Sequence, residues 1–294
     1  MQNPISFLIP KKLFVARDYV RQKIEQAVQD EAYGTPAQGS TLFEDLAHLY
    51  QDLEIPKSAF TDCHLVAIVG LMSNVINMVT WAICHIVADP ELRSSILDQI
   101  NTIVIATSET KEGDPLTGNL SLDANLIREK CPLLVATWYE LLRLYGDAPV
   151  ARSVTHPSLF HNRFLVQKNA FIMVPIHIQN FNTEIWGADA ESFRPSRFLK
   201  EDGGSVEQEL VKQLTVFGLP GMHQCPGRYL ALNITLGVVA KVLCSFEFEG
   251  RVEVPGRKET MLGMPAMDGD PEVLVRREGV GEVRVGFEDV RPGW

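Results

Sequence analysis

Apolar residues return every three or four positions through much of the chain, with polar or charged residues between them. This spacing places the apolar side chains on one face of a helix, so it predicts amphipathic helices that pack against a core. The strongest of these patterns stops at Gly146, a residue that commonly ends a helix. The predicted helices cover residues 16–29, 42–53, 91–100 and 124–145, and a mostly apolar helix is predicted at residues 229–246.

One stretch differs from the others, because residues 63–88 contain no charged side chain. Its length meets the requirement for a membrane-spanning helix. It also carries polar groups that hydrocarbon would leave without partners, so a long helix through a protein core, at about residues 60–88, is favoured over the membrane span. These polar residues are His64, Ser73, Asn74, Asn77, Thr80 and His85.

Short apolar runs between turn residues predict strands in the second half of the chain. From residue 250 onward Gly and Pro recur among such runs, a pattern typical of β-hairpins, which we expect up to about residue 290. The predicted strands are residues 150–154, 164–166, 171–175, 272–276 and 282–287.

Composition narrows the class of protein. The chain has 294 residues, 46% of them hydrophobic, which is ample for a sizeable core. Its formal net charge is -10 and it has no basic cluster, which argues against a nucleic-acid partner and a polybasic membrane patch. Residues 5–10 are too short an apolar run for a signal peptide.

The cysteines indicate a reducing, intracellular environment. They are odd in number, scattered, and never spaced as Cys-x-x-Cys, so we expect no disulfide partner for any of them. The five are Cys63, Cys84, Cys131, Cys225 and Cys244.

Cys225 is the candidate for chemistry. It follows a Gly/Pro-rich loop and precedes an apolar helical run, so unpaired helix N-terminal N–H groups would favour its thiolate. Glycines at 218, 221 and 227 allow the backbone to approach a flat cofactor closely. Iron best fits a single thiolate without a second Cys or His at zinc spacing. The alternative is a buried structural cysteine.

The loop at residues 217–231 resembles the heme-binding loop of cytochromes P450, whose pattern is Phe-x-x-Gly-x-Arg/His-x-Cys-x-Gly followed by Ala. One departure is that the Phe lies eight residues before the Cys, where the family has seven. The resemblance implies heme b as the cofactor and Cys225 as the ligand of its iron. The matching residues are Phe217, Gly221, His223, Cys225, Gly227 and Ala231.

Two further motifs of the family occur in the expected order. Glu140 and Arg143 form its Glu-x-x-Arg, and residues 193–198 match its Phe-x-Pro-x-Arg-Phe. The resemblance implies that Glu140, Arg143 and Arg197 form a buried triad behind the heme. Without the resemblance to the family, a Glu-x-x-Arg is more commonly interpreted as an exposed ion pair at spacing i, i+3. Arg152 matches the position that commonly pairs with a heme propionate, and His223 matches another.

The uncharged helix matches the family's helix across the distal face of the heme. At residues 70–74 the usual Ala/Gly-Gly-x-x-Thr pattern is replaced by one that ends in Ser73 and Asn74, with Trp81 seven residues later. With residues 131–134, this resembles the subgroup of sterol 7α-hydroxylases, prostacyclin synthase and many fungal P450s. An amide can hydrogen-bond an oxygen but cannot relay a proton as a hydroxyl does, so Asn74 and Ser73 are the candidate catalytic residues. Alternatively, Asn74 is hydrogen-bonded to a neighbour.

The resemblance implies a mainly α fold with small β-sheets, an α+β class, as a single partial domain over residues 1–294. The activity implied is a heme-thiolate monooxygenase that oxidises a hydrophobic small molecule such as a sterol, a lipid or a secondary metabolite. NADPH-cytochrome P450 reductase or a similar protein would donate the electrons. The alternatives are a reductase-independent isomerase or dehydratase and a non-catalytic remnant.

The match covers essentially the whole chain but only about the C-terminal three-fifths of a full cytochrome P450. Residues 1–60 resemble only the helices that precede the distal helix. We therefore expect the N-terminal part of the family fold to be absent, including the membrane anchor that commonly holds family members at the endoplasmic reticulum.

Overall fold

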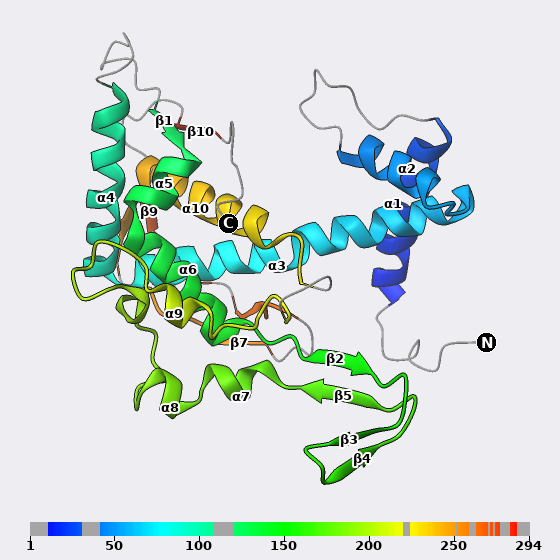
Figure 1. Cartoon of the computed structure of the whole chain (residues 1–294). Helices are drawn as coiled ribbons and strands as arrows, with labels where there is room; N and C mark the ends of the chain where they lie inside the picture. Colours follow the sequence, from blue (N-terminus) through cyan, green and yellow to red (C-terminus); the bar gives the residue numbers. More distant parts are fainter. Residues whose placement is uncertain are drawn as a thin grey trace. The chain divides into compact units, whose positions relative to one another are not determined.

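A computed structural model gives the fold of the chain (Figure 1). The chain divides into two compact units, Met1–Ser73 and Asn74–Trp294, and the boundary lies inside one continuous helix. That the chain forms a single partial domain therefore remains a prediction. The structure describes residues 11–30, 42–108, 120–219, 224–250, 252–258, 263–269, 271–272, 274–276 and 283–286.

The first unit contains α1 (Lys11–Gln29), α2 (Leu42–Asp52), the short 3-10 helix η3 (Lys57–Ala59) and the start of α3 (Phe60–Ala88). α1 begins before residue 16, the predicted start. Its small core is built from Val28, Ala47, Tyr50 and Phe60. The ring of Tyr50 meets that of Phe60 edge-on, with centroids 5.3 Å apart, which fixes α2 against the beginning of α3.

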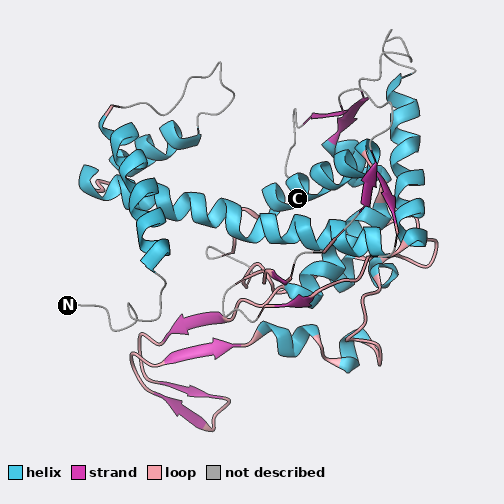
Figure 2. Ribbon diagram, turned by 180° about the vertical axis from the view of Figure 1, so that it is seen from behind, coloured by secondary structure: helices cyan, strands magenta, loops and turns pink. Residues whose placement is uncertain are grey.

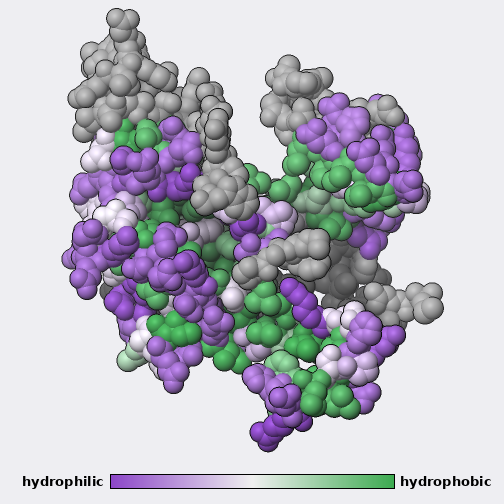
Figure 3. Space-filling model, in the orientation of Figure 1, coloured by the Kyte–Doolittle hydropathy of each residue, from purple (hydrophilic) through white to green (hydrophobic). Residues whose placement is uncertain are grey.

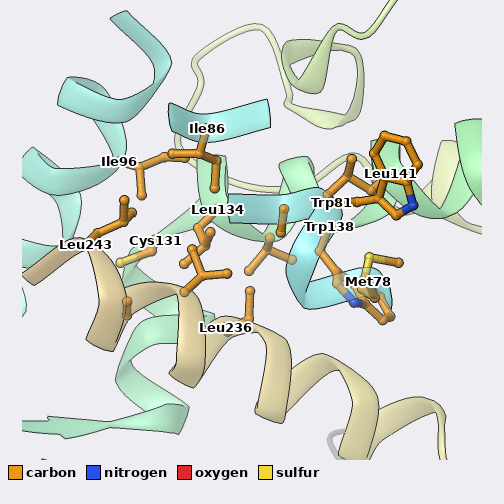
Figure 4. Close-up of a cluster of buried hydrophobic side chains, with 14 of the residues drawn as sticks. Met78, Trp81, Ile86, Ile96, Cys131, Leu134, Trp138, Leu141, Leu236 and Leu243 are labelled. Atoms are coloured by element: carbon orange, nitrogen blue, oxygen red, sulfur yellow. The ribbon is translucent and has the colours of Figure 1, made fainter. Parts of the chain in front are cut away.

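The second unit is a helical core around the remainder of α3. α4 (Pro90–Ser108), α5 (Ala124–Lys130), α6 (Pro132–Tyr145) and α10 (Arg228–Ser245) pack against one another. The buried side chains that join these helices include a row on α3 and facing residues on α4, α6 and α10, shown in Figure 4. Among them are Met78, Trp81, Ile86, Ile96, Leu134, Trp138, Leu141, Leu236 and Leu243.

The prediction of one helix over residues 124–145 is wrong. Cys131 has φ −115° and ψ 63° and separates α5 from α6. The cause is Pro132, which lacks an N–H and pushes the preceding residue out of the helical region. Proline then suits the first turn of α6, where the Leu133 N–H donates to Gln99 Oε1 at 3.1 Å.

Strands form only two-stranded sheets in the described part of the chain (Figure 2). β2 (Val150–Ser153) pairs antiparallel with β5 (Phe171–Val174), with Val150 opposite Val174. β3 (Ser158–Phe160), which was not predicted, pairs antiparallel with β4 (Phe164–Val166). These four strands leave many apolar side chains exposed, and hydrophobic surface lies over them in Figure 3.

The C-terminal strands pair differently from the expected hairpins. β7 (Gly256–Arg257) and β8 (Met267–Asp268) form one local antiparallel pair. β9 (Leu274–Arg276) instead pairs antiparallel with β6 (Glu247–Glu249). β10 (Val283–Gly286) pairs parallel with β1 (Leu120–Asp123). Shorter helices are α7 (Ile176–Asn180), α8 (Thr183–Trp186), η4 (Pro195–Phe198) and α9 (Gln208–Val211).

Long helices with small two-stranded sheets confirm the predicted mainly α, α+β class. Among the described residues, two helical stretches are long and apolar enough to cross a membrane by length and composition. They are Lys57–Ala88 and Arg228–Ser245. Both also supply side chains to the core of the second unit, while Val66, Val69 and Met72 of the first stretch are exposed.

Candidate functional site

Glu140 lies at the centre of a buried network on α6. Its side chain and that of Arg143 are both 0% exposed. Arg143 Nε donates to Glu140 Oε2 and Arg143 Nη2 to Glu140 Oε1, each at 2.8 Å, so the pair is bidentate. Glu140 Oε1 also accepts from the Arg194 N–H at 2.9 Å and from Arg197 Nε at 3.5 Å. The structure thus brings the three residues of the predicted triad together.

Arg143 uses all of its donors. Besides its two bonds to Glu140, Nη1 donates to the carbonyls of Asn180 and Ala190 at 2.8 and 2.6 Å, and Nη2 donates to that of Ser192 at 3.3 Å. A guanidinium has five N–H groups in a fixed plane, and here each has an acceptor. Arg143 therefore fixes the path of the chain from α7 to residue 192 against α6.

Arg197 extends the network toward the surface. Its Nη1 donates to the carbonyl of Trp186 and, at 3.1 Å, to Asp189 Oδ1, while Nη2 donates to the Asp189 carbonyl at 3.0 Å. The hydrogen bond from Arg197 lowers the pKa of Asp189. Arg194, which also pairs with Asp189, lowers this pKa further. The Asp189 carboxylate is therefore charged at neutral pH and forms ion pairs with both arginines.

The other side of α6 carries the loop that leads to Cys225. Trp138 stacks on Phe217, with ring centroids 5.8 Å apart and planes at 24°. At the end of α6 a side chain on Gly146 would overlap the Leu142 carbonyl oxygen and lie 2.8 Å from Val216 Cγ1. Glycine is therefore needed at position 146 for close contact with the loop. α6 thus supports both the triad and the start of the Cys225 loop.

Cys225 lies two residues before Gly227, the N-cap of α10, and its side chain is exposed. The Cys225 N–H donates to the Phe217 carbonyl at 2.8 Å, and Arg228 Nη1 donates to the Cys225 carbonyl at 3.0 Å. Because these bonds use the backbone of Cys225, its sulfur takes no part in closing the loop. Cys225 lies just ahead of the positive end of the α10 dipole.

All five cysteines lie in the described residues, and Cys225 differs from the other four because it is exposed. Cys84 and Cys131 are buried, and Cys63 and Cys244 are half-buried. Burial raises the pKa of Cys131 to about 12 and that of Cys244 to about 11, and it also raises the pKa of Cys84. These three stay protonated thiols at neutral pH. Cys225 is the one of the five thiols that lies in the exposed class.

The donor set at Cys225 fits the iron of a heme. Within the described residues, no group of three or more His, Cys, Asp and Glu side chains could hold a metal ion. A single cysteine thiolate is a protein ligand that heme iron can take, because the macrocycle supplies most of its other ligands. A Cβ on Gly227 would lie 3.7 Å from the sulfur, so glycine leaves free volume beside it.

The structure describes only some of the residues that were predicted to contact the heme. Arg152 lies on β2 with an exposed side chain, whose Nη1 donates to the Ala151 carbonyl at 2.9 Å. Ala231 lies in the first turn of α10, where its N–H donates to the Gly227 carbonyl at 2.8 Å. Gly221 and His223 lie outside the described residues.

Ser73 and Asn74 are neighbouring exposed residues in the middle of α3. Asn74 Oδ1 accepts from the Met264 N–H at 2.9 Å, so the side chain already has a protein partner. The interpretation of Asn74 as a helix-face residue hydrogen-bonded to a neighbour thus has a physical basis. Neither residue is brought near Cys225 by any contact among the described residues.

Some residues that hold this region together carry no recognisable signal in the sequence. Trp138, which stacks on the Cys225 loop, looked like any core aromatic residue, and Asp189, which holds Arg197, looked like any surface acid. The carbonyls that accept from Arg143 carry no side-chain signal at all. Only the motif around Arg197 pointed to this region, and it did not reveal which atoms would meet.

Beside the triad lies a pocket of about 620 Å³ with a buried histidine in its wall. His85 Nε2 is 2.7 Å from the Tyr145 hydroxyl, and the ring of Phe193 lies 4.0 Å from that of His85. Desolvation lowers the pKa of His85 to about 4 and raises that of Tyr145 to about 12. His85 is thus neutral at pH 7, and its Nε2 shares a hydrogen bond with the tyrosine hydroxyl. The pocket also contains His177, Glu191 and Arg257.

We predict that the free energy of unfolding falls as the pH drops from about 6.5 to about 4. The pKa of His85 is lower in the folded protein, so the unfolded chain binds the proton more tightly in this window. The stabilisation is complete above pH 6.5, and about 3 kcal/mol of it is lost on acidification. Urea midpoints measured against pH should show this slope in the wild type and a weaker one in His85→Phe. A wild-type slope in His85→Phe, or a change in slope on replacing the exposed His48 with Gln, would contradict the assignment.

Comparison with known proteins places this site in context. A family model described as Cytochrome P450 matches residues 10–271. Similar curated proteins include the cytochrome P450 monooxygenases nodJ of Hypoxylon pulicicidum (27% identical over 189 residues, 63% of this chain and 36% of that protein) and calL of Penicillium decumbens (32% over 189 residues, 62% and 33%). Cytochrome P450 7B1 of Mus musculus is 29% identical over 199 residues, 63% of this chain and 37% of that protein. The chain thus spans about a third of the length of these relatives.

Proposed function

The chain belongs to the cytochrome P450 family, and from this premise we propose that it is a heme-thiolate monooxygenase with Cys225 as the ligand of the heme iron. The observation that carries the proposal is the placement of Cys225. It is the exposed cysteine, and its loop is supported by the helix that holds the buried Glu140–Arg143 pair. A drifting sequence would have no reason to keep a buried ion pair and an exposed thiol in this arrangement.

Cytochrome P450 family proteins bind heme b. When bound, such a heme activates dioxygen for insertion into a substrate, and the thiolate ligand favours O–O cleavage. In this chain Cys225 would hold the iron, and Arg152 and His223 would pair with the negatively charged propionates. Small residues would let the ring approach the backbone, and Phe217 would cover the loop. These small residues are Gly221, Gly227 and Ala231.

The residues around Cys225 orient the sulfur rather than react. The bond from the Cys225 N–H to Phe217 fixes the backbone, and the Trp138 stack fixes Phe217 to α6. α10 follows directly, so its N-terminal dipole interacts favourably with a negatively charged sulfur. Together these contacts preorganise a thiolate ligand.

On the distal side we propose that Ser73 and Asn74 serve the reaction. A serine hydroxyl both donates and accepts, so Ser73 can move a proton. The Asn74 amide can donate a hydrogen bond through Nδ2 but cannot relay a proton, while its Oδ1 is used by Met264. This lack of a relaying hydroxyl at position 74 is what favours the alternative, an isomerase or dehydratase that needs no external electrons.

We propose a hydrophobic small molecule as the substrate, in the class of sterols, lipids or secondary metabolites. The relatives named as cytochrome P450 monooxygenases support an oxidation, and the substrate class rests on the subgroup that residues 70–74 and 131–134 resemble. The electron donor would be NADPH-cytochrome P450 reductase or a similar protein, and the location intracellular. The net charge of -10 continues to argue against a nucleic-acid partner. Because the chain spans about a third of its relatives, a non-catalytic form is the remaining alternative.

Turnover with and without reducing equivalents tests the reaction type. The heme-loaded chain is incubated with a sterol or a fatty acid under labelled dioxygen, with reductase and NADPH present or omitted. A monooxygenase places one labelled oxygen atom in the product and consumes NADPH, and Cys225→Ala abolishes both. Conversion that is equal without NADPH would replace the proposal with the isomerase. Intact substrate in every arm, with heme bound, would indicate the non-catalytic form.

A further inference from the structure

Three side chains on one face of α3 bind the backbone of a distant turn, residues 263–265. Asn74 Oδ1 accepts from the Met264 N–H at 2.9 Å, Asn77 Nδ2 donates to the Met264 carbonyl at 2.8 Å, and Trp81 Nε1 donates to the Pro265 carbonyl at 2.7 Å. The spacings of three and four residues put all three side chains on one side of the helix. All of these residues belong to the second unit.

These bonds satisfy every polar backbone group of Met264 and Pro265. Met264 has one N–H and one carbonyl, and each meets an asparagine. Pro265 has no N–H, and its carbonyl meets the indole of Trp81. Both residues of the turn are buried, so each group left without a partner would be costly. Side chains of α3 thus supply the hydrogen bonds that the backbone of the turn needs.

Glycine at 263 permits the close approach of Asn74. A Cβ on Gly263 would overlap Asn74 Oδ1 and lie 3.0 Å from Asn74 Cγ. The residue also has φ +80°, a conformation that side-chain-bearing residues rarely adopt. On its other side the Gly263 carbonyl accepts from the Asp147 N–H at 3.2 Å, just beyond α6. The turn is therefore held from α3 and from the end of α6.

The contact between α3 and the 263–265 turn is fixed by packing in the core. Trp81 is fully buried, and its ring stacks on Tyr145 with centroids 3.9 Å apart. Met264 is buried in the same cluster as Met78 of α3 and Met267 of β8. The turn therefore cannot leave α3 without exposing methionine side chains and breaking three hydrogen bonds.

We propose that Asn74, Asn77 and Trp81 are positioning residues that clamp the 263–265 turn onto α3, and that Gly263 is required for Asn74 to reach it. Resting on the proposed function, the clamp would hold the turn beside Asn74, on the face of α3 that we propose serves the reaction. The clamp would thus set the shape of the substrate site, with Asn74 acting on the protein through Oδ1. A role that only involved contact with substrate would not require its specific pairing with Met264.

The same substitution at two positions tests the direction of each bond. Asn74→Asp keeps an oxygen facing the Met264 N–H, whereas Asn77→Asp removes the donor and puts a carboxylate against the Met264 carbonyl. We expect amide exchange at Met264 in the heme-free chain to stay within about twofold of wild type in Asn74→Asp. It should become about tenfold faster in Asn74→Leu and in Asn77→Asp. Equal exchange in all three variants, or faster exchange in Asn74→Asp than in Asn77→Asp, would overturn the clamp.

A double-mutant cycle tests the role of Gly263. Gly263→Ala should lower the thermal midpoint more than Gly269→Ala, because Gly269 has φ +109° but no atom within 4 Å of an added Cβ. In the Asn74→Ala background the overlapping oxygen is gone, so Gly263→Ala should cost less than in the wild type. Additive effects, or equal shifts for the two glycines, would contradict the inference.

The effect on the site is measured separately in the heme-loaded chain. The ratio of dissociation constants for imidazole and 4-phenylimidazole should change about threefold in Asn77→Asp but not in the surface variant His48→Gln. An unchanged ratio in Asn77→Asp would overturn the positioning role. Exchange and midpoints need no heme, so the clamp can be established even when a missing thiolate spectrum refutes the proposed function.

Discussion

Replacing Arg143 with alanine is expected to lower the free energy of unfolding by about 3–5 kcal/mol, because it breaks a fully buried ion pair. Glu140 would keep only the Arg194 N–H and the 3.5 Å contact with Arg197. The carbonyls of Asn180 and Ala190 would lose the donor that they share. Since a domain has only about 5–15 kcal/mol of stability, this loss removes a large part of it. Denaturant unfolding followed by far-UV circular dichroism measures the loss.

A matched control exists on the surface. Glu209 and Lys212 form an ion pair at the same i, i+3 spacing, 2.6 Å apart, with both side chains largely exposed. Glu209→Ala should change stability by less than about 0.5 kcal/mol, because solvent screens the pair. Arg143→Lys should remain strongly destabilised, since three donors on one nitrogen cannot reach the acceptors of a planar guanidinium. Similar losses for Arg143→Ala and Glu209→Ala would contradict the account of the triad.

Replacing Cys225 with alanine is expected to abolish the thiolate spectrum of the heme-loaded chain while leaving the fold intact. The sulfur is exposed, and the bonds that close its loop come from the Cys225 backbone, which alanine retains. The change in unfolding free energy should therefore stay below about 1 kcal/mol. Absorbance spectra and denaturant midpoints of the same preparation measure the two effects together.

Cys244 provides the opposite control on the helix that follows Cys225. It is half-buried against the core, and burial keeps it a protonated thiol. Cys244→Ala should retain the thiolate spectrum and lose about 1 kcal/mol of stability through lost packing. If Cys244→Ala removed the spectrum, or if Cys225→Ala kept it, Cys225 could not be the ligand.

The helices of the core could be predicted because their signal is local. The uncharged stretch gave α3 and the apolar run after the loop gave α10, since each pattern is contained within the helix itself. The break between α5 and α6 was also readable from Pro132, yet the apolar spacing continues across it and suggested one helix. Where two local signals disagreed, the steric one decided the structure.

Strand pairing and the clamp on the 263–265 turn could not be predicted. β1 and β10 are separated by most of the second unit, and nothing within either strand names its partner. Asn74 and Trp81 bind backbone groups of the turn, and a backbone carbonyl looks the same at every residue. The triad was anticipated from Glu140, Arg143 and Arg197 themselves, but the carbonyls that complete it were not, for the same reason.

The central claim, a heme iron held by Cys225, is tested most directly by the absorbance spectrum of the reduced, carbon monoxide-bound chain. The purified protein is supplied with heme, reduced, and compared with Cys225→Ala. The account predicts the red-shifted Soret band of a thiolate-bound heme in the wild type and its absence in the variant. A wild-type spectrum without that band, or the same band in Cys225→Ala, would contradict it.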